Sequence, residues 1–269
     1  MRDIQSAISF IENNGNDFEK ARLASIVNDS QPSQEIINKF AILQNKDGGF
    51  PYKNIQGSLT TINNSLFVLS WLDDLNLLQT PIARKLFQFL FEKEKNDGTW
   101  IEDSNILEYG PPSWMDPRHD ETKIYDTVYT LFWLLKLNLI PNGKFSFYTE
   151  NLTQYINRNG SFEGSLQNTW IGVSCLAMLN SWESAPVQRP LEYISSYPTT
   201  QYTVSELAWL LLTFLLAKYP PKNRLTAILS TNLFERQSSS GAFESEEGRM
   251  FDVETTLQAL RIAKILKLL

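Results

Sequence analysis

Apolar positions recur with helical spacing along the whole chain, in pairs of segments joined by short polar turns. In residues 36–43 they fall three or four positions apart, whereas residues 59–78 are apolar on more than one side. The first pattern is typical of a helix that covers a core, and the second of a buried helix. We therefore predict six helical hairpins at a period of about 45 residues, over residues 4–27, 36–78, 81–139, 149–182, 190–219 and 221–269.

A glycine turn followed by an aromatic residue separates the two helices in most of these pairs. Its clearest copy is QNKDGGF at residues 44–50, with related turns at 96–100, 159–162 and 240–243. Glycine adopts left-handed backbone conformations without strain, and the aromatic side chain can then fold back onto the helix that has just ended. The turn is thus a helix stop with a built-in anchor. In the fifth pair, Tyr197 and Pro198 replace the glycine turn.

The second helix of each pair should lie inside the molecule and the first helix outside, because the first is amphipathic and the second is nearly all apolar. Six such pairs close naturally into an all-α (α/α)6 toroid. An open solenoid of the same hairpins is the alternative, but it would leave the second helices exposed to water on its concave side. Repetition from end to end favours a single domain over residues 1–269.

Charge and composition exclude several classes of protein. The formal charge is −6 without a basic block, so we expect no nucleic-acid partner and no attraction to an anionic membrane. One cysteine, Cys175, and one histidine, His119, exclude a disulfide framework and a metal site built from several such ligands. We expect no metal and no cofactor. The longest apolar run, residues 207–217, is about half of the length that spans a bilayer, and we expect a cytoplasmic protein.

The turn and the helix after it carry a family resemblance. A glutamine three residues before DGGF, followed by a Thr-led apolar helix, resembles the repeat of terpene cyclases and protein prenyltransferase β-subunits. Gln44 and Phe50 stand where the glutamine-tryptophan repeat of the cyclases has its glutamine and terminal aromatic residue. The resemblance covers nearly all of the chain. It implies an α/α toroid whose apolar central cavity binds an isoprenoid, and it is more specific for fold than for activity.

The same resemblance points to three carboxylates as candidate catalytic residues. Class II cyclases carry a DxDD motif at the start of one inner helix, and its nearest match here is Asp252-Val253-Glu254-Thr255. Glu254 would donate the proton and Asp252 would be its partner; alternatively, Asp252 is a helix N-cap and Glu254 a favourable first-turn charge. Asp126 is the next candidate acid. It also matches the Asp of the prenyltransferase D-x-C zinc pair, but Val128 replaces the thiolate, so zinc is not expected.

Polar and aromatic side chains on the second helices are the candidate ligand contacts. Stacking these helices places Thr61, Asp126, Asn168, Ser205 and Thr255 at equivalent N-terminal positions, where they either cap their helices or meet the polar end of a ligand. Aromatic rings there could stabilise carbocations, or could simply pack the core. The predicted substrate-binding residues are Thr61, Phe67, Trp71, Tyr129, Trp133, Asn168, Trp170 and Trp209.

A long segment, residues 102–121, interrupts the third hairpin. It holds Tyr109, Trp114 and His119, and loops of this length are often lids or binding loops. His119 could shuttle protons or could be an ordinary exposed histidine.

Three functions remain open from the sequence. The first is a terpene-cyclase-like enzyme, an isomerase or lyase, or an isoprenoid-binding protein. The second is a non-catalytic toroid, like a prenyltransferase subunit, with a helical protein partner or as a homo-oligomer. The third is a carbohydrate-active toroid with aromatic platforms and paired acids.

Overall fold

Helices make up most of the described chain. The computed structural model describes residues 3–269, which contain twelve α-helices, six short 3-10 helices and one two-stranded antiparallel sheet of β1 (Phe50–Pro51) and β2 (Thr60–Thr61). The predicted all-α class is therefore confirmed. The α-helices are α1 (Ile4–Asn14), α2 (Asp17–Asn28), α3 (Gln34–Leu43), α4 (Ile62–Asp74), α5 (Pro81–Glu92), α6 (Asp120–Lys136), α7 (Phe145–Thr153), α8 (Leu166–Leu179), α9 (Ala185–Ser196), α10 (Val204–Leu216), α11 (Arg224–Glu235) and α12 (Asp252–Ile265).

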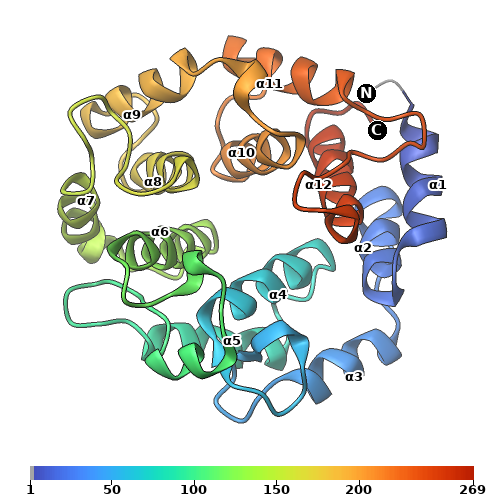
Figure 1. Cartoon of the computed structure of the whole chain (residues 1–269), viewed down its shortest axis with the longest axis horizontal. Coiled ribbons are helices and arrows are strands. Elements are labelled where there is room, and N and C mark those ends of the chain that lie inside the picture. Colours follow the sequence, from blue (N-terminus) through green and yellow to red (C-terminus); the bar gives the residue numbers. More distant parts are fainter. Residues whose placement is uncertain (1–2) are drawn as a thin grey trace. The chain divides into compact units, whose positions relative to one another are not determined.

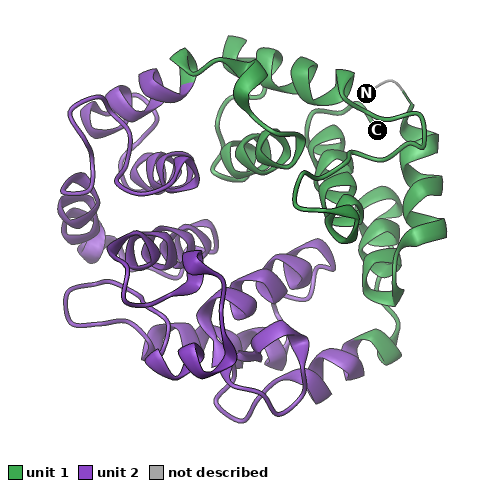
Figure 2. Ribbon diagram, in the orientation of Figure 1, with its two compact units in different colours: residues 1–36, 195–269 green, residues 37–194 purple. Residues whose placement is uncertain are grey.

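The helices form two compact units. One unit combines residues 1–36 with residues 195–269, and the other consists of residues 37–194, as Figure 2 shows. We call them the terminal unit and the central unit. The terminal unit is discontinuous in sequence, because it joins the two ends of the chain.

In the central unit, α6 packs against both α8 and α4, while α7 covers α8 and α5 covers α4 (Figure 1). The second helix of each hairpin is the more deeply buried one. α8 buries 11 of its 14 residues, whereas α7 buries only Tyr148 and Leu152 among its nine. This difference follows from the sequence pattern, since a helix that is apolar all round gains most by losing contact with water on every side.

In the terminal unit, α12 packs against α10, α2 and α1. The last hairpin of the chain therefore contacts the first. Their shared core is apolar and comprises Ala7, Ile11, Leu23, Ile26, Val253, Leu257 and Leu260. Helices more than 200 residues apart in sequence are thus held together by the same kind of packing that joins consecutive hairpins.

The predicted aromatic anchors are buried, and the next helix holds each of them in the same way. Phe50, Trp100, Phe162 and Phe243 are at most 1% exposed. The backbone N–H of each anchor donates a hydrogen bond of 2.8–3.0 Å to a hydroxyl group near the start of the second helix, on Ser65, Thr127, Thr169 and Thr256 respectively. A buried N–H group needs such a partner, so a small hydroxyl residue is required at this helix position.

The glycine of the turn allows close packing against the outer helix of a neighbouring hairpin. Gly48 has a φ of 91°, and a Cβ atom there would lie 2.4 Å from the Lys85 carbonyl oxygen of α5. Gly160 and Gly241 have φ values of 97° and 89° and would bring a Cβ atom within 2.5 Å of Arg189 O and 2.3 Å of Ser6 O. The turn therefore needs glycine both for its backbone conformation and for the missing side chain.

Glutamine side chains hold two of these turns against the first helix of a neighbouring hairpin. Gln44 Nε2 donates to Gly48 O at 2.7 Å and to Ile82 O, in the first turn of α5, at 2.9 Å. Gln237 Nε2 donates to Gly241 O at 3.1 Å and to Asp3 O, the N-cap of α1, at 2.7 Å. The last turn of the chain thus contacts the first helix in the way that an internal turn contacts the next hairpin.

These hydrogen bonds correct the alignment of the second helices that was inferred from the sequence, at one residue of α4. The hydroxyl acceptors Ser65, Thr127 and Thr169 are equivalent, so the residues before them, Asn64, Asp126 and Asn168, share a level. Thr61 lies almost one turn earlier and is the N-cap of α4, where its hydroxyl accepts from Asn64 N–H at 3.2 Å. The sequence stacking misplaced α4 because it counted back from Leu72, whereas the C-cap of α4 is Leu75, which corresponds to the C-cap Leu137 of α6.

Candidate active site in the central unit

Asp126 is the most deeply buried carboxylate among the predicted site residues. It lies on α6 with 1% of its surface exposed. Its Oδ2 atom accepts a hydrogen bond from the backbone N–H of Glu102 at 3.0 Å. Its Oδ1 atom is buried and makes no hydrogen bond of normal geometry within the described residues, although the Asn63 side chain lies close enough to lower the pKa of Asp126. Burying such an oxygen atom costs much free energy when the carboxyl group is charged and far less when the group is protonated.

Glu102 brings a second buried carboxyl group to the same place. It follows the Trp100 anchor and is 4% exposed. Its two carboxyl oxygens accept hydrogen bonds from the backbone N–H groups of Ile62, at 2.9 Å, and Asn63, at 2.7 Å. These are free donors in the first turn of α4, where the helix dipole also favours negative charge. Glu102 therefore caps α4 and joins it to α6 through Asp126.

The two carboxyl groups have raised pKa values. Burial raises the pKa of Glu102 to about 7, against the lowering effect of its two backbone hydrogen bonds. Burial, together with the nearby charge of Glu102, raises the pKa of Asp126 well above its ordinary value. Two adjacent buried carboxylates cannot both be charged at low cost. At neutral pH the pair retains a proton, and Asp126, which has no backbone donors on Oδ1, is the group that holds it.

Polar side chains extend from Asp126 along one face of α6. Thr122 and Thr130 lie four residues before and after it, which is the spacing of neighbours on one helix face. Both are at most 1% exposed, and neither hydroxyl oxygen has a hydrogen-bond partner among the described residues. Buried polar atoms without hydrogen-bond partners are uncommon in a packed core, so this stripe is unusual.

Half-buried aromatic rings lie on the same pair of helices, α4 and α6. On α6, Tyr125 and Tyr129 are half-buried, with ring centroids 5.7 Å apart. On α4, the ring centroids of Phe67 and Trp71 are 5.0 Å apart, and Phe67 is half-buried. Because α4 packs against α6, the central unit brings an acid and aromatic rings to one pair of helices.

The other predicted ligand contacts divide into core and capping residues. Trp133 is 2% exposed and Trp170 is fully buried, so both rings fill the core of the central unit. Thr61 is buried as the N-cap of α4. Asn168 donates from Nδ2 to Glu163 O at 3.0 Å, while its Oδ1 atom has no hydrogen-bond partner in the described chain. Trp209 is half-buried on α10 of the terminal unit.

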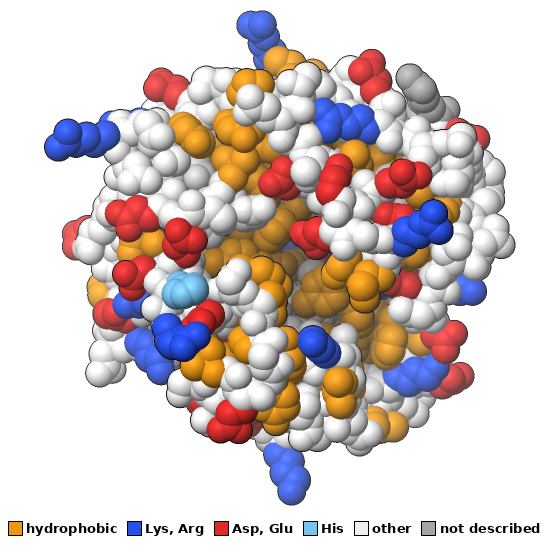
Figure 3. All heavy atoms as spheres, viewed as in Figure 1, with side chains coloured by type: hydrophobic (Ala, Val, Ile, Leu, Met, Phe, Trp, Pro, Cys, Tyr) orange, Lys and Arg blue, Asp and Glu red, His pale blue; other side chains and the backbone are white. Residues whose placement is uncertain are grey.

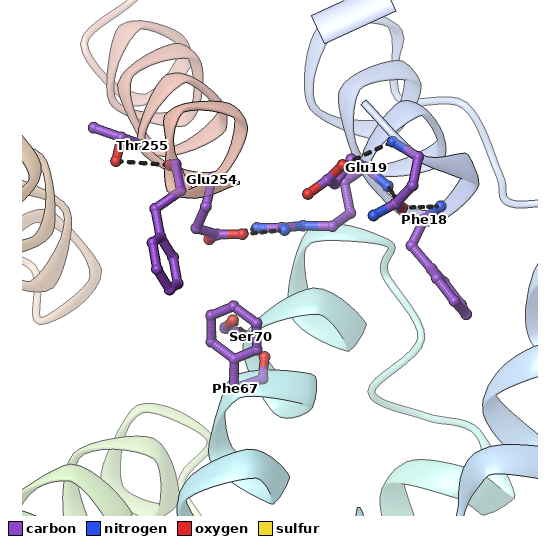
Figure 4. A network of polar contacts seen from close by, with 9 residues as sticks. Phe18, Glu19, Phe67, Ser70, Glu254 and Thr255 are labelled. Carbon is purple, nitrogen blue, oxygen red and sulfur yellow. Dashed lines mark hydrogen bonds and ion pairs between the residues drawn. The ribbon is translucent and has the colours of Figure 1, made fainter. Parts of the chain in front are cut away.

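Glu254 lies in the terminal unit and forms a two-pronged ion pair with Arg22 of α2. Arg22 Nη1 donates to Glu254 Oε2 at 2.5 Å and Nη2 donates to Oε1 at 2.9 Å. Figure 4 shows the Glu254 side chain extended from α12 toward α2. Arg22 is 1% exposed, so the pair is shielded from water. A guanidinium group in this position favours the ionised form of the carboxyl group, whereas a proton donor must be protonated.

Asp252, the predicted partner of Glu254, is occupied within the same unit. Its Oδ1 atom accepts a hydrogen bond from Ser245 N–H at 2.7 Å, and its backbone carbonyl accepts from the Thr256 hydroxyl. Asp252 therefore fastens the loop before α12 to the first turn of that helix. No hydrogen bond between the two carboxyl groups of Asp252 and Glu254 is present in the described structure.

The remaining polar features do not assemble a further catalytic site. His119 is exposed before α6 and lies on the face shown in Figure 3, where acidic, basic and apolar side chains are interspersed. Within residues 3–269, no three His, Cys, Asp or Glu side chains are grouped so as to hold a metal ion. No helix in this described range has both the length and the apolar character needed to cross a bilayer.

Sequence reasoning missed Glu102 and Arg22. Glu102 falls at the start of the long segment after the third turn, and nothing local distinguishes it from other loop acids. Its position two residues after the Trp100 anchor is the one usable signal, because the anchor fixes where the following backbone meets the next helix. Arg22 lies in the hairpin with the weakest repeat, and its partner is 232 positions away.

Comparison with known proteins shows the fold. No known family profile matches this sequence, and no curated protein matches it significantly. Among solved structures, the chain is similar to a type II terpene cyclase. That structure is a variant of MstE from Scytonema in complex with its product, merosterolic acid A; the two chains are 11% identical and superpose with a TM-score of 0.62 over 99% of this chain and 96% of the other. The likeness confirms the α/α fold class expected from the repeats.

Proposed function

We propose that this protein binds a linear isoprenoid against α4 and α6 and cyclises it, with Asp126 as the proton donor. The observation that carries the proposal is the buried pair of Asp126 and Glu102 beside half-buried aromatic rings. The pair keeps a proton at neutral pH, and the rings offer apolar surface and negative π faces. The likeness to a type II terpene cyclase supports the same chemistry.

The position of the proton follows from the hydrogen bonds. Oδ2 of Asp126 already accepts the Glu102 N–H, so the proton resides on Oδ1, the oxygen without a partner. In the reaction the Oδ1–H bond breaks and the proton bonds to one carbon of the terminal double bond. The π electrons form the new C–H bond and leave a tertiary cation on the other carbon.

Ring closure then requires no further reagent. An internal double bond attacks the cation, a C–C bond forms, and the last cation loses a neighbouring proton to water. The product is a cyclic isomer of the substrate, and water returns a proton to Asp126. In this proposal, Phe67 and Tyr129 stabilise the cations through their ring faces, by about 0.5–2 kcal/mol per ring.

Glu254 remains the alternative donor, with Asp252 as its partner, as the resemblance to the DxDD motif implies. Asp126 is the better candidate, because its burial favours the protonated form whereas Arg22 favours the ionised form of Glu254. The two residues lie in different units, so separate substitutions distinguish them.

The proposal is tested with geranylgeraniol and squalene as probes. The parent protein should bind at least one of them in native mass spectrometry and convert it to a cyclic isomer. Asp126→Asn keeps the shape of the side chain and removes the acid, so it should still bind the probe but lower turnover by a factor of about 10² or more. Asp74→Asn, which alters a buried carboxyl group at the other end of α4, is the control and should turn over normally.

Other outcomes would overturn the assignment. Unchanged turnover in Asp126→Asn, with loss in Glu254→Gln, would move the acid to α12. Binding of the probe without conversion in the parent protein would indicate an isoprenoid-binding protein. If neither probe binds, the isoprenoid assignment is wrong, and co-purification of a stoichiometric protein would then favour the non-catalytic alternative.

A further inference from the structure

The long segment before α6 carries an exposed tryptophan next to the aromatic rings of that helix. Trp114, in the 3-10 helix η3 (Ser113–Met115), is 52% exposed. Its ring meets Tyr125 of α6 edge to face, with centroids 6.1 Å apart, and Tyr125 in turn lies 5.7 Å from Tyr129. These three rings form a continuous row, which we call the aromatic row. Tyr125 precedes Asp126 in the sequence of α6, and Tyr129 follows it by three residues.

The segment that carries Trp114 is well anchored. Ile106 and Met115 are buried in a small apolar cluster with Tyr52, and Leu59 and Leu107 pack against this cluster. The backbone beyond it is held by Asp116, whose carboxylate accepts a hydrogen bond from the backbone N–H of Arg118 at 3.0 Å and further bonds from the Arg118 guanidinium group. Met115 points into the core while its neighbour Trp114 points outward. The exposed ring is therefore held in place and is not on a loose loop.

The exposure of Trp114 has no explanation in the packing of the unit. A tryptophan ring exposes a large apolar surface, and proteins usually bury such a ring or use it for binding. Tyr109, on the same segment, is similarly exposed at 46%, but its ring packs against Tyr52, a member of the small apolar cluster. The two residues thus differ in what lies behind them: a structural cluster for Tyr109 and the aromatic row for Trp114.

We propose that Trp114 is a binding residue for the isoprenoid chain, and that the aromatic row guides the chain from the surface to Asp126. This inference rests on the proposed function and names a substrate contact outside the reacting site. An apolar chain laid along the row would cover the free face of Trp114, and a chain with π bonds gains further from stacking on aromatic rings. Loss of the Trp114 ring should therefore weaken binding of the chain without changing the rate of the chemical step.

The test separates binding from chemistry. Binding of geranylgeraniol is measured in an Asp126→Asn background, in which turnover does not interfere, and KM and kcat are measured in the parent background. Trp114→Ala should weaken binding and raise KM by about tenfold, with kcat unchanged. Trp114→Phe should restore most of the affinity, because a ring remains on the row. Tyr109→Ala, the matched control, should change neither quantity.

Two results would contradict this assignment. Equal affinity of Trp114→Ala and its parent would show that the ring does not touch the chain, and an equal loss in Tyr109→Ala would show a general effect on the segment. If Asp126→Asn binds geranylgeraniol but the Trp114 variants do not differ, only this inference fails. If no variant and no parent binds it, both this inference and the proposed function fail.

Discussion

At the scale of single residues, the site depends on two buried carboxyl groups that the fold holds side by side. Glu102 receives two N–H groups from α4 and gives its own N–H to Asp126. The partners of Glu102 stabilise negative charge, whereas burial opposes it, and the balance leaves its pKa at about 7. Burial and the nearby charge of Glu102 raise the pKa of Asp126 well above its ordinary value, against the lowering effect of the Glu102 N–H and the Asn63 side chain, so Asp126 keeps its proton. The surroundings thus favour negative charge on Glu102 and the proton on Asp126.

This pair predicts that stability falls as pH rises from 4.5 to above 7. The pKa of Glu102 is raised from 4.5 to about 7 on folding, so in this range the folded state binds more protons than the unfolded state. The stabilising contribution is complete below pH 4.5 and is lost as pH rises through 7. For Glu102 alone, the loss by pH 8 is on the order of 3 kcal/mol.

Urea unfolding of the parent and of Glu102→Gln at pH 5 and pH 8 measures this effect. The parent should be less stable at pH 8 than at pH 5, and Glu102→Gln should show a smaller difference, because the amide does not titrate. If the stability of the parent and that of Glu102→Gln change by the same amount between pH 5 and pH 8, the pKa of Glu102 is not raised on folding.

At the scale of helices and turns, most features of the structure could be predicted from the sequence. The six hairpins and the greater burial of each second helix followed from apolar spacing, because burial of a helix is set by how many of its faces are apolar. The aromatic anchors followed from the turns. The level of Thr61 was wrong, because α4 has several leucines near its end and the apolar pattern alone does not show which of them is the C-cap. Glu102 was missed because its role depends on an anchor that places a loop against two other helices.

The turn glycines yield a prediction at this scale. Gly48→Ala should lower the free energy of unfolding by about 3 kcal/mol, because it combines a left-handed φ with a clash against the Lys85 carbonyl. Gly57→Ala should cost only about 1 kcal/mol, since Gly57 has a φ of 82° but nothing within 4 Å of the added Cβ atom.

Chemical denaturation of the two variants separates strain from contact. Equal losses of stability would mean that the turn needs glycine only for its backbone conformation and does not require close approach to α5. A much larger loss for Gly48→Ala would show that the turn is the point where consecutive hairpins meet.

At the scale of the whole chain, the same repeat unit serves two different purposes. In the terminal unit the start of α12 carries Glu254, which is paired with Arg22 and joins the last hairpin to the first. In the central unit the corresponding region of α6 carries Asp126, whose Oδ1 atom is left without a partner. The sequence motif alone favoured α12, because DxDD is a local pattern; the choice of α6 depends on contacts between distant segments, which no local pattern records.

The most direct measurement of the central claim is the origin of the proton in the product. The parent protein, exchanged into D₂O and given geranylgeraniol or squalene, should form a cyclic isomer that carries one deuterium at the carbon protonated first, because the acidic proton of Asp126 exchanges with solvent. Asp126→Asn should form the labelled product more slowly by a factor of about 10² or more. A cyclic product without deuterium, or a labelled product formed equally fast by Asp126→Asn, would contradict the account.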